Sequence, residues 1–472
     1  AIHNETPTSA SFACSDPIMT KFWQNTVWTQ RANFVEIPTD CPQRDERLGW
    51  MGDAQTYSKT AAYNTDISAF YTKWLDDVDE AQLPEGQYPD YCPYPMGHGD
   101  PGKNFGTGWT DAGIICPYTL YEMYGDVSVI KRHWRSMTNF MDWRQAVGTG
   151  FLGTSLGNPW GDWLNAGETT SIQFIDTCYY AYDAHLMSKM AAAAGIQGEA
   201  KKYSDLFEAV KAAFHKKYVN SEGLLTETSQ SAYALALSLG LVSGDEATRF
   251  EAKLAQKVNE RGVRMTTGFL GTRRILPALS TTGDHSDLAV QLFLSRRYPS
   301  WGYEVVNGAN TVWERWDSFT KEHGFEGENG GQNAAMNSFS HYSFGAVMEW
   351  GFARLAGIDT IGAGFKHILI APTVPRFTEN ANAKPLTSVT ATYDSIRGQI
   401  VSLWQRRGNH LYFMVKIPAN TKATIKLPCS ANGLTESDVP IETVTSVKVV
   451  SKTPKVTTLS VGSGTYVFEG EF

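Results

Sequence analysis

The sequence predicts a mainly helical protein, in which a ring of helix hairpins (an α/α toroid) precedes a smaller antiparallel β-sandwich. From about residue 16 to 357, apolar residues recur at helical spacing in roughly a dozen stretches. After about residue 362 the pattern changes to short alternating or β-branched runs, separated by Gly, Asn and Pro turns. A solenoid would show a sequence period, and none is visible.

The helices are expected in chain order from their start signals and apolar faces. Asp16 and Pro17 mark the first start, because Pro is well placed in a first helical turn. After Asp66, apolar residues recur at helical spacing from Ile67 to Val78. Further helices are expected at residues 112–124, 127–146, 172–194, 199–218, 229–239, 245–260, 268–280, 284–296 and 333–356.

Two long loops interrupt the helical part, at residues 84–110 and 148–170, and both are rich in Trp, Tyr, Gly and Asp. Loops of that length inside a compact domain are usually functional. We therefore expect functional side chains in them.

The C-terminal segment is expected to form a β-sandwich of roughly 100 residues. It holds no cluster of acids or histidines, which favours a structural role. The expected division is a strand or linker remnant at 1–15, the helical domain at 16–360 and the sandwich at 361–472. Strands are expected at residues 367–371, 389–393, 398–406, 409–417, 422–427, 444–450 and 465–468.

Composition narrows the classes of partner. The chain has 472 residues, of which 42% are apolar and 19% charged, as in a folded globular protein. Its net charge of −8 and the lack of a basic run argue against nucleic acid as a partner. No apolar run approaches the ~20 residues of a membrane helix, so no membrane partner is expected.

Cofactor signals are also missing. The six cysteines are scattered without a C-x-x-C pair, which argues against a disulfide framework or a structural zinc site. No H-E-x-x-H, P-loop or dinucleotide fingerprint occurs, so neither a metal nor a cofactor is expected. The chain starts at Ala1, without Met or a signal peptide, and its first residues resemble the end of an earlier strand or linker. This indicates a fragment or the loss of N-terminal domains, and it leaves the compartment open.

The most informative segment runs from Asp40 to Asp53, with the sequence DCPQRDERLGWMGD. Acids interleaved with arginines can keep one carboxyl ready to give a proton while others stay ionised. The tryptophan offers a flat apolar surface of the kind a sugar ring needs. The alternative is a salt-bridged helix start with Asp53 as its N-cap.

A second segment, residues 310–317, has the sequence NTVWERWD and places Glu314 between two tryptophans and beside an arginine. A carboxylate walled by indoles could act as a base toward a water molecule, and the alternative is an ordinary ion pair in an aromatic loop. Glycoside hydrolysis uses two carboxyl groups. Glu46 and Glu314 are the natural pair, from two ends of a ring that closes on itself.

Three shorter motifs place a polar group among aromatic residues: Trp109-Thr-Asp111, Trp160-Gly-Asp162-Trp163 and Ser340-His341-Tyr342. Each alone is more often structural, but together with two acid–Trp motifs they favour a sugar pocket. The match of residues 153–157 to G-x-S-x-G has glycine-rich flanks instead of the strand and helix that a nucleophile elbow needs.

Taken together, these motifs resemble those of the bacterial α-L-rhamnosidases of glycoside hydrolase family 78. The resemblance is carried by the segment 39–53 and continues in order through the motifs at 109–111, 160–163, 312–316 and 337–345. It implies an (α/α)6 barrel followed by a β-sandwich, and an inverting hydrolysis of terminal α-L-rhamnosyl groups.

The resemblance also implies roles. Glu46 would be the general acid and Glu314 the general base. Residues that would bind the sugar or line its pocket are Asp40, Arg44, Trp50, Asp53, Trp109, Trp160 and His341, with Asp111 and Asp162 in matching motifs. Asp45 is left with a structural role. Members of the family usually carry β-domains before the barrel, which this chain does not include.

Three alternatives stay open on the sequence alone. The same fold could act on another terminal deoxy-sugar or on a uronic acid, because a methyl or hydroxyl group is read by only a few contacts. An α/α-toroid polysaccharide lyase would need a Tyr or His base near a cation, and the Glu pair argues against it. A catalytically inactive sugar-binding module would be expected to have lost one of the two acids. The linkage, the aglycone, polysaccharide versus small glycoside, and the oligomeric state are not indicated.

Overall fold

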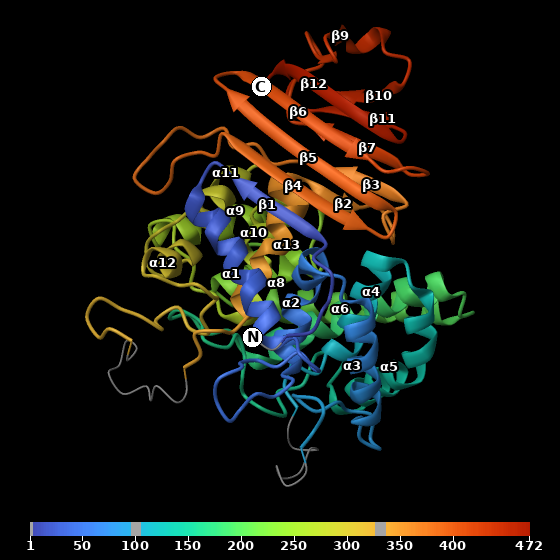
Figure 1. The fold of residues 1–472 in the computed structure, drawn as a ribbon. Helices are drawn as coiled ribbons and strands as arrows, with labels where there is room; N and C mark the ends of the chain where they lie inside the picture. Colours follow the sequence, from blue (N-terminus) through green and yellow to red (C-terminus); the bar gives the residue numbers. More distant parts are fainter. Residues whose placement is uncertain (1–2, 96–104, 326–336) are drawn as a thin grey trace.

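The computed structural model describes residues 3–95, 105–325 and 337–472. A helical domain lies beneath two β-sheets formed largely by the C-terminal part of the chain (Figure 1). This confirms the predicted class, mainly helical with a smaller β-domain at the C-terminus. Within the described residues, no helix is both long enough and apolar enough to cross a membrane.

The helices begin largely where the sequence indicated. The carboxylate of Asp16 accepts a hydrogen bond from the backbone N–H of Ile18, with Pro17 in the first turn, and Asp126 caps a later helix in the same way. The helices are α1 (Pro17–Asn33), α2 (Met51–Asn64), α3 (Ser68–Glu80), α4 (Ala112–Tyr124), α5 (Val127–Val147), α6 (Ile172–Ala194), α7 (Glu199–Tyr218), α8 (Gln230–Ser238), α9 (Gly244–Glu260), α10 (Phe269–Ala278), α11 (Ser286–Phe293) and α12 (Trp301–Val306).

Alternate helices form the inner ring of an (α/α)6 barrel. α2 contacts α4, α4 contacts α6, α6 contacts α8 and α8 contacts α10, and the segment after residue 342 closes the ring between α10 and α2. All fourteen residues of α2 are buried, whereas α3 and α9 bury one face. The inner helix α2 is therefore buried on all sides, whereas the outer helices α3 and α9 are amphipathic.

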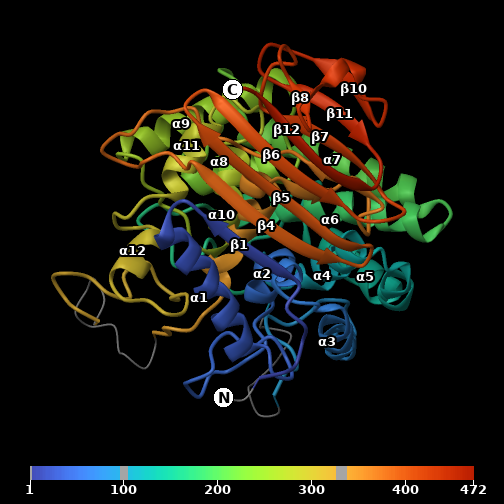
Figure 2. The same cartoon turned by 45° about the horizontal axis from the view of Figure 1, so that its top comes forward.

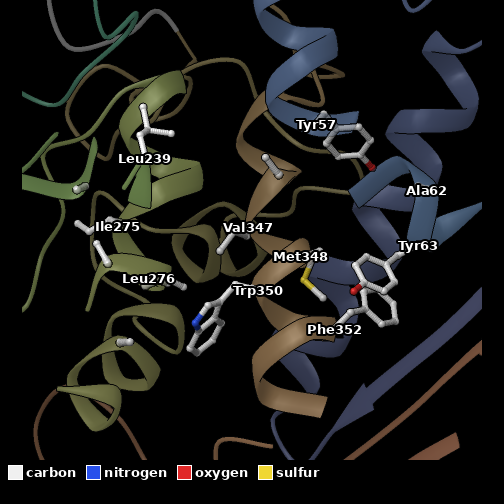
Figure 3. Packing of buried hydrophobic residues seen from close by; sticks show 14 of the residues in the cluster. Tyr57, Ala62, Tyr63, Leu239, Ile275, Leu276, Val347, Met348, Trp350 and Phe352 are labelled. Carbon is white, nitrogen blue, oxygen red and sulfur yellow. The ribbon is translucent and has the colours of Figure 1, made fainter. Parts of the chain in front are cut away.

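The closing segment differs from the predicted helix at 333–356. Residues 326–336 lie outside the described part, so the expected start cannot be compared, and residues 337–342 are not helical. Three short pieces follow: η3 (Ser343–Val347), α13 (Met348–Trp350) and η4 (Gly351–Ala356), which are 3₁₀, α and π in character. Figure 3 shows them between α10 and α2, with Trp350 and Phe352 pointing to opposite sides. This segment packs against α2 on one side and α10 on the other, and these contacts replace a regular helical repeat.

Two sheets make up the β-domain. The larger has the order β1-β4-β5-β6-β12-β8-β9 and the smaller β10-β11-β7-β3-β2. The strands are β1 (Ala10–Cys14), β2 (Ile358–Thr360), β3 (His367–Ile370), β4 (Ser388–Ser395), β5 (Gly398–Arg407), β6 (His410–Ile417), β7 (Lys422–Leu427), β8 (Thr435–Glu436), β9 (Val439–Pro440), β10 (Val447–Lys452), β11 (Thr457–Val461) and β12 (Gly464–Glu471), with a short 3₁₀ turn η5 (Ile441–Thr443).

One pair departs from the expected antiparallel arrangement, because β3 and β7 are parallel. The chain leaves β3, builds β4, β5 and β6 in the other sheet, and returns; a connection of that length allows parallel pairing. β1, from the N-terminal segment, pairs antiparallel with β4 at the edge of the larger sheet. Figure 2 shows this sheet lying across the helices.

The β-domain contacts the ends of the inner ring. Trp404 Nε1 and Ser402 Oγ of β5 donate to the carbonyls of Leu355 and Ala356 at 2.8 and 2.6 Å. The hydroxyl of Tyr63, near the end of α2, donates to the Ile358 carbonyl at 2.8 Å. The six cysteines form no disulfide, and all six lie in the described residues.

Candidate active site

The Asp40–Asp53 segment forms a closed loop that leads into α2. The backbone N–H of Asp40 donates to the Leu48 carbonyl, and the Leu48 N–H donates to the Asp40 carboxylate, at 3.0 and 2.9 Å. Steric crowding explains why positions 49 and 52 are glycines. A Cβ at Gly49 would lie 2.0 Å from the Cys92 carbonyl oxygen, and one at Gly52 would lie 2.5 Å from the ring of Trp109.

A cavity of about 530 Å³ opens over this loop. Most of the predicted site residues meet there. The side chains that line it are Arg44, Asp45, Glu46, Leu48, Trp50, Asp53, Trp109, Trp160, Trp163, Phe269, Glu314 and His341.

Glu46 and Glu314 share one guanidinium. Arg44 Nη2 lies 2.5 Å from Glu46 Oε2 and 3.4 Å from Glu314 Oε1, while Nη1 donates to Glu314 Oε2 at 3.1 Å. Glu46 also accepts from Trp50 Nε1 at 2.7 Å, and Glu314 from the backbone N–H of Ser338 at 2.7 Å. Glu314 is buried, whereas Glu46 is partly exposed. The two acids therefore differ in access to solvent.

The floor of the cavity carries a buried pair. His341 Nε2 lies 2.7 Å from Asp53 Oδ1, which also accepts from the Ser343 hydroxyl. Burial alone would lower the pKa of His341, but the charges of Asp53 and Glu314 outweigh it and raise the pKa to about 9. The imidazole is thus a cation at neutral pH. Asp53 is not the helix N-cap of the alternative interpretation, since α2 begins at Met51 without a side-chain cap.

Asp40 lies just behind Arg44 and is completely buried. Burial raises its pKa to about 7, the nearby His341 lowers it and Glu46 raises it further. Its Oδ2 atom has no hydrogen-bond partner within the described part of the chain. Asp40 is not among the side chains that line the cavity, and this oxygen lies 3.7 Å from Arg44 Nη2 and 4.0 Å from His341 Nδ1.

Asp40, Cys41 and Glu46 bring possible metal ligands within 4.8 Å of one another. The Arg44 guanidinium already lies between the two acids, 3.7 Å from Asp40. Burial also raises the pKa of the Cys41 thiol.

One wall of the cavity is built from indoles. Trp160 packs edge to face against Trp50 and Trp163 at 5.8 and 5.5 Å between ring centroids. Its Nε1 donates to Asp90 at 2.6 Å, and Asn158 donates to the same oxygen at 2.5 Å. Asp90 is fully buried, and burial raises its pKa to about 6.

The sequence analysis did not identify Leu48, Trp163 and Phe269 of the cavity lining, or Asp90, which accepts a hydrogen bond from Trp160. Trp163 belongs to the same motif as Trp160 and could have been chosen with it. Phe269 and Asp90 carry no motif, and only the fold brings Phe269 to the cavity and Asp90 to Trp160.

The structure places Asp111 and Asp162 outside the lining of this cavity. Asp111 is fully buried, accepts from the Gly108 N–H at 2.7 Å and pairs with Arg144. Asp162 accepts from the backbone N–H groups of Gly268, Leu270 and Gly271 and from the Ser231 hydroxyl, so it caps α10. Both carboxylates therefore already take part in buried hydrogen-bond networks.

Asp45 was expected to be structural. It is exposed at the rim of the cavity, with Arg47 4.0 Å away.

Family comparisons agree with this geometry. Residues 7–355 match the bacterial alpha-L-rhamnosidase 6 hairpin glycosidase domain, and residues 357–442 match the bacterial alpha-L-rhamnosidase C-terminal domain. The chain is 37% identical to an alpha-L-rhamnosidase of Streptomyces avermitilis over 90% of its own length and 39% of that protein. It is 33% identical to an alpha-L-rhamnosidase of Formosa agariphila over 98% of its length and 49% of that protein.

Solved structures give the same result. The Streptomyces avermitilis alpha-L-rhamnosidase complexed with L-rhamnose superimposes with a TM-score of 0.89 at 35% identity, over 99% of this chain and 43% of that one. The alpha-L-rhamnosidase of Dictyoglumus thermophilum gives 0.88 at 28% identity, over all of this chain and 51% of that one.

The chain thus spans about half the length of these relatives or less. The two matched domains cover almost the whole helical ring and much of the β-domain. The chain belongs to the bacterial α-L-rhamnosidase family, of which it contains the six-hairpin glycosidase domain and the C-terminal domain.

Proposed function

We propose that this chain hydrolyses terminal, non-reducing α-L-rhamnosidic bonds by a single displacement with inversion. Glu46 and Glu314 are far apart in the sequence, but both line one cavity, which has a wall of indole rings. This observation carries the proposal. The identity of the sugar is proposed from family membership, because the structure of a Streptomyces avermitilis relative has been solved with L-rhamnose.

Glu46 is the proposed general acid. It is the more exposed of the two acids and lies toward the rim, where a leaving aglycone would be released. It gives its proton to the glycosidic oxygen as the bond from that oxygen to the anomeric carbon breaks. Glu314, held by the Ser338 N–H in the buried part, takes a proton from the water that attacks the opposite face.

The position of Arg44 sets a condition on this mechanism. Because one of its nitrogens lies 2.5 Å from Glu46 and 3.4 Å from Glu314, the nearest oxygens of the two acids are at most about 6 Å apart. Inverting enzymes need roughly 6.5–9.5 Å between the carboxyl groups. We infer that Arg44 and the Glu46 side chain move apart when the sugar binds. A structure with L-rhamnose bound in which Arg44 still bridged both acids would contradict this.

The sugar is proposed to be held by Asp40, Asp53 and the His341 imidazolium through its hydroxyl groups. Within the described chain, Asp40 Oδ2 and His341 Nδ1 have no hydrogen-bond partner, and the two atoms lie 4.0 Å apart. Trp50, Trp109 and Trp160 offer apolar surface to the ring and its methyl group. No metal or cofactor is part of the proposal.

The deciding experiment is proton NMR of the sugar first released from an aryl α-L-rhamnoside. β-L-rhamnose as the first product supports inversion, and α-L-rhamnose would show retention. A panel of nitrophenyl glycosides tests the sugar itself: faster turnover of another deoxy-sugar or a uronoside would replace rhamnose in the proposal. An unsaturated product absorbing in the ultraviolet would indicate a lyase.

Substitution of either acid tests its role. Glu46→Gln and Glu314→Gln should each lower kcat by a factor on the order of 10²–10⁴, the usual contribution of general acid–base catalysis. Glu322→Gln is a control, since Glu322 is an exposed acid close in sequence to Glu314. Near-normal turnover in either active-site variant would remove that residue from the mechanism.

A further inference from the structure

A second cavity lies at the other end of the helical ring. It measures about 220 Å³, and every inner element contributes to it. One lining residue from each of α2, α4, α6, α8, α10 and α13 is, in that order, Lys59, Tyr118, Tyr182, Ser238, Arg274 and Glu349. Asp53 of the catalytic cavity is near the start of α2, whereas Lys59 is further along and lies 3.3 Å from Asp359 of β2. The second cavity therefore faces the β-domain.

Three carboxylates around this cavity share two cations. Lys59 Nζ lies 3.1 Å from Glu122 and 3.3 Å from Asp359. Arg273 Nε donates to Glu349 at 2.9 Å. All three carboxylates thus have a cation within ion-pair distance.

Two further cations lack such a partner. Arg274 and Lys189 both line the cavity, and neither has a carboxylate within 4.0 Å among the described residues. Arg274 is only 8% exposed, and its Nε and Nη2 atoms have no acceptor in the described chain. A buried guanidinium is ordinarily paired, because an unpaired buried charge is costly.

Aromatic rings compensate only in part. The Arg274 guanidinium lies 5.1 Å from the ring centroid of Tyr182, and Lys189 Nζ lies 5.8 Å from that of Tyr118. Cation–π contacts stabilise a cation but accept none of its hydrogen bonds. Burial, with Lys189, lowers the pKa of His185 to about 4, so this imidazole adds a neutral ring N–H. The lining is rich in donors and carries excess positive charge.

We propose that this cavity binds a small oxyanion, such as phosphate or a carboxylate, through Arg274 and Lys189. Arginine presents its N–H groups as a planar fork that matches two oxygens of such an anion. A bound anion would join α6 and α10 across the end of the ring, and would therefore stabilise the folded chain. The proposal does not depend on the rhamnosidase reaction.

The test is a titration with sodium phosphate at constant ionic strength, followed by calorimetry and by the thermal unfolding temperature. Wild type should bind one phosphate saturably and unfold at a higher temperature as the site fills. Arg274→Gln and Lys189→Met should each weaken binding about tenfold or more, the effect of losing a charge-assisted hydrogen bond. Lys201→Met is the matched control, because Lys201 is an exposed helix lysine outside the cavity.

Each outcome decides the proposal. Arg274→Lys keeps the positive charge but lacks the planar fork of N–H donors. A phosphate affinity between those of wild type and Arg274→Gln therefore supports the assignment, even if Arg274→Gln folds poorly. No saturable binding by wild type, or equal binding by Arg274→Gln and wild type, would overturn it. Binding abolished in Arg44→Met and retained in Arg274→Gln would place the anion in the catalytic cavity and would also overturn it.

Discussion

Asp90 allows a prediction about stability and about the indole wall. It is fully buried, and one of its oxygens accepts from both Trp160 and Asn158. Asparagine has nearly the same shape and retains an oxygen for these donors. Asp90→Asn therefore removes a buried charge and should leave the position of Trp160 largely unchanged.

The magnitude follows from the pKa of about 6 in the folded chain, against about 4 when unfolded. The folded state holds the proton more tightly, so the stability that this group contributes is present below about pH 4 and is lost as the pH rises through 6. The full change is about 3 kcal/mol, of which about 1.4 kcal/mol falls between pH 5 and 7.5. Between pH 5 and 7.5 the free energy of unfolding of Asp90→Asn should therefore rise by about 1.4 kcal/mol relative to that of wild type.

The assay is urea unfolding at pH 5 and pH 7.5, followed by tryptophan fluorescence, for wild type, Asp90→Asn and Asp284→Asn. Asp284 is an exposed carboxylate, so its variant reports changes unrelated to burial. Asp90→Ala provides a second arm: it leaves Trp160 Nε1 without its acceptor and should raise KM. The reasoning is refuted if the free-energy difference between Asp90→Asn and wild type is the same at both pH values.

Three further predictions concern other buried groups. Arg144→Met leaves three buried carboxylates without their cation and should lower the free energy of unfolding by about 3–5 kcal/mol, measured by urea titration. The raised pKa of His341 stabilises the fold below about pH 6.5, and this is lost as the pH rises through 9. In wild type, kcat/KM should fall as the pH rises through 9. The pH profile of His341→Gln should lack this fall. Gly52→Ala should displace Trp109 and reduce kcat/KM roughly tenfold or more, with steady-state kinetics as the measurement.

The helical periodicity was enough to predict most of the fold. The expected helix at 112–124 coincides with α4, and those at 172–194 and 199–218 with α6 and α7. Short elements were harder to predict from the sequence: α12 has six residues, and β8 and β9 have two each. Such pieces are too short to show a period, and they exist because tertiary contacts hold them.

The sequence signal for a site is strongest where chemically active residues are close together in the chain. Four carboxylates, two arginines and a tryptophan within residues 40–53 are informative by their density alone. Asp90 could not be found, because a single aspartate in a loop has no pattern. The bridging position of Arg44 also could not be found, because it depends on bringing Glu314 to the same place.

Asp111 and Asp162 show how the cavity wall is held. Trp109 lines the cavity, and two residues later Asp111 ties its loop to the buried Arg144. Trp160 lines it too, and two residues later Asp162 caps α10, whose first residue, Phe269, also faces the cavity. An aromatic residue that contacts substrate needs a rigid backbone, and a buried carboxylate bound to several donors provides one. The Trp-x-Asp pattern in this chain therefore combines a wall residue with its anchor, and a sequence alone does not distinguish that arrangement from two residues that both bind sugar.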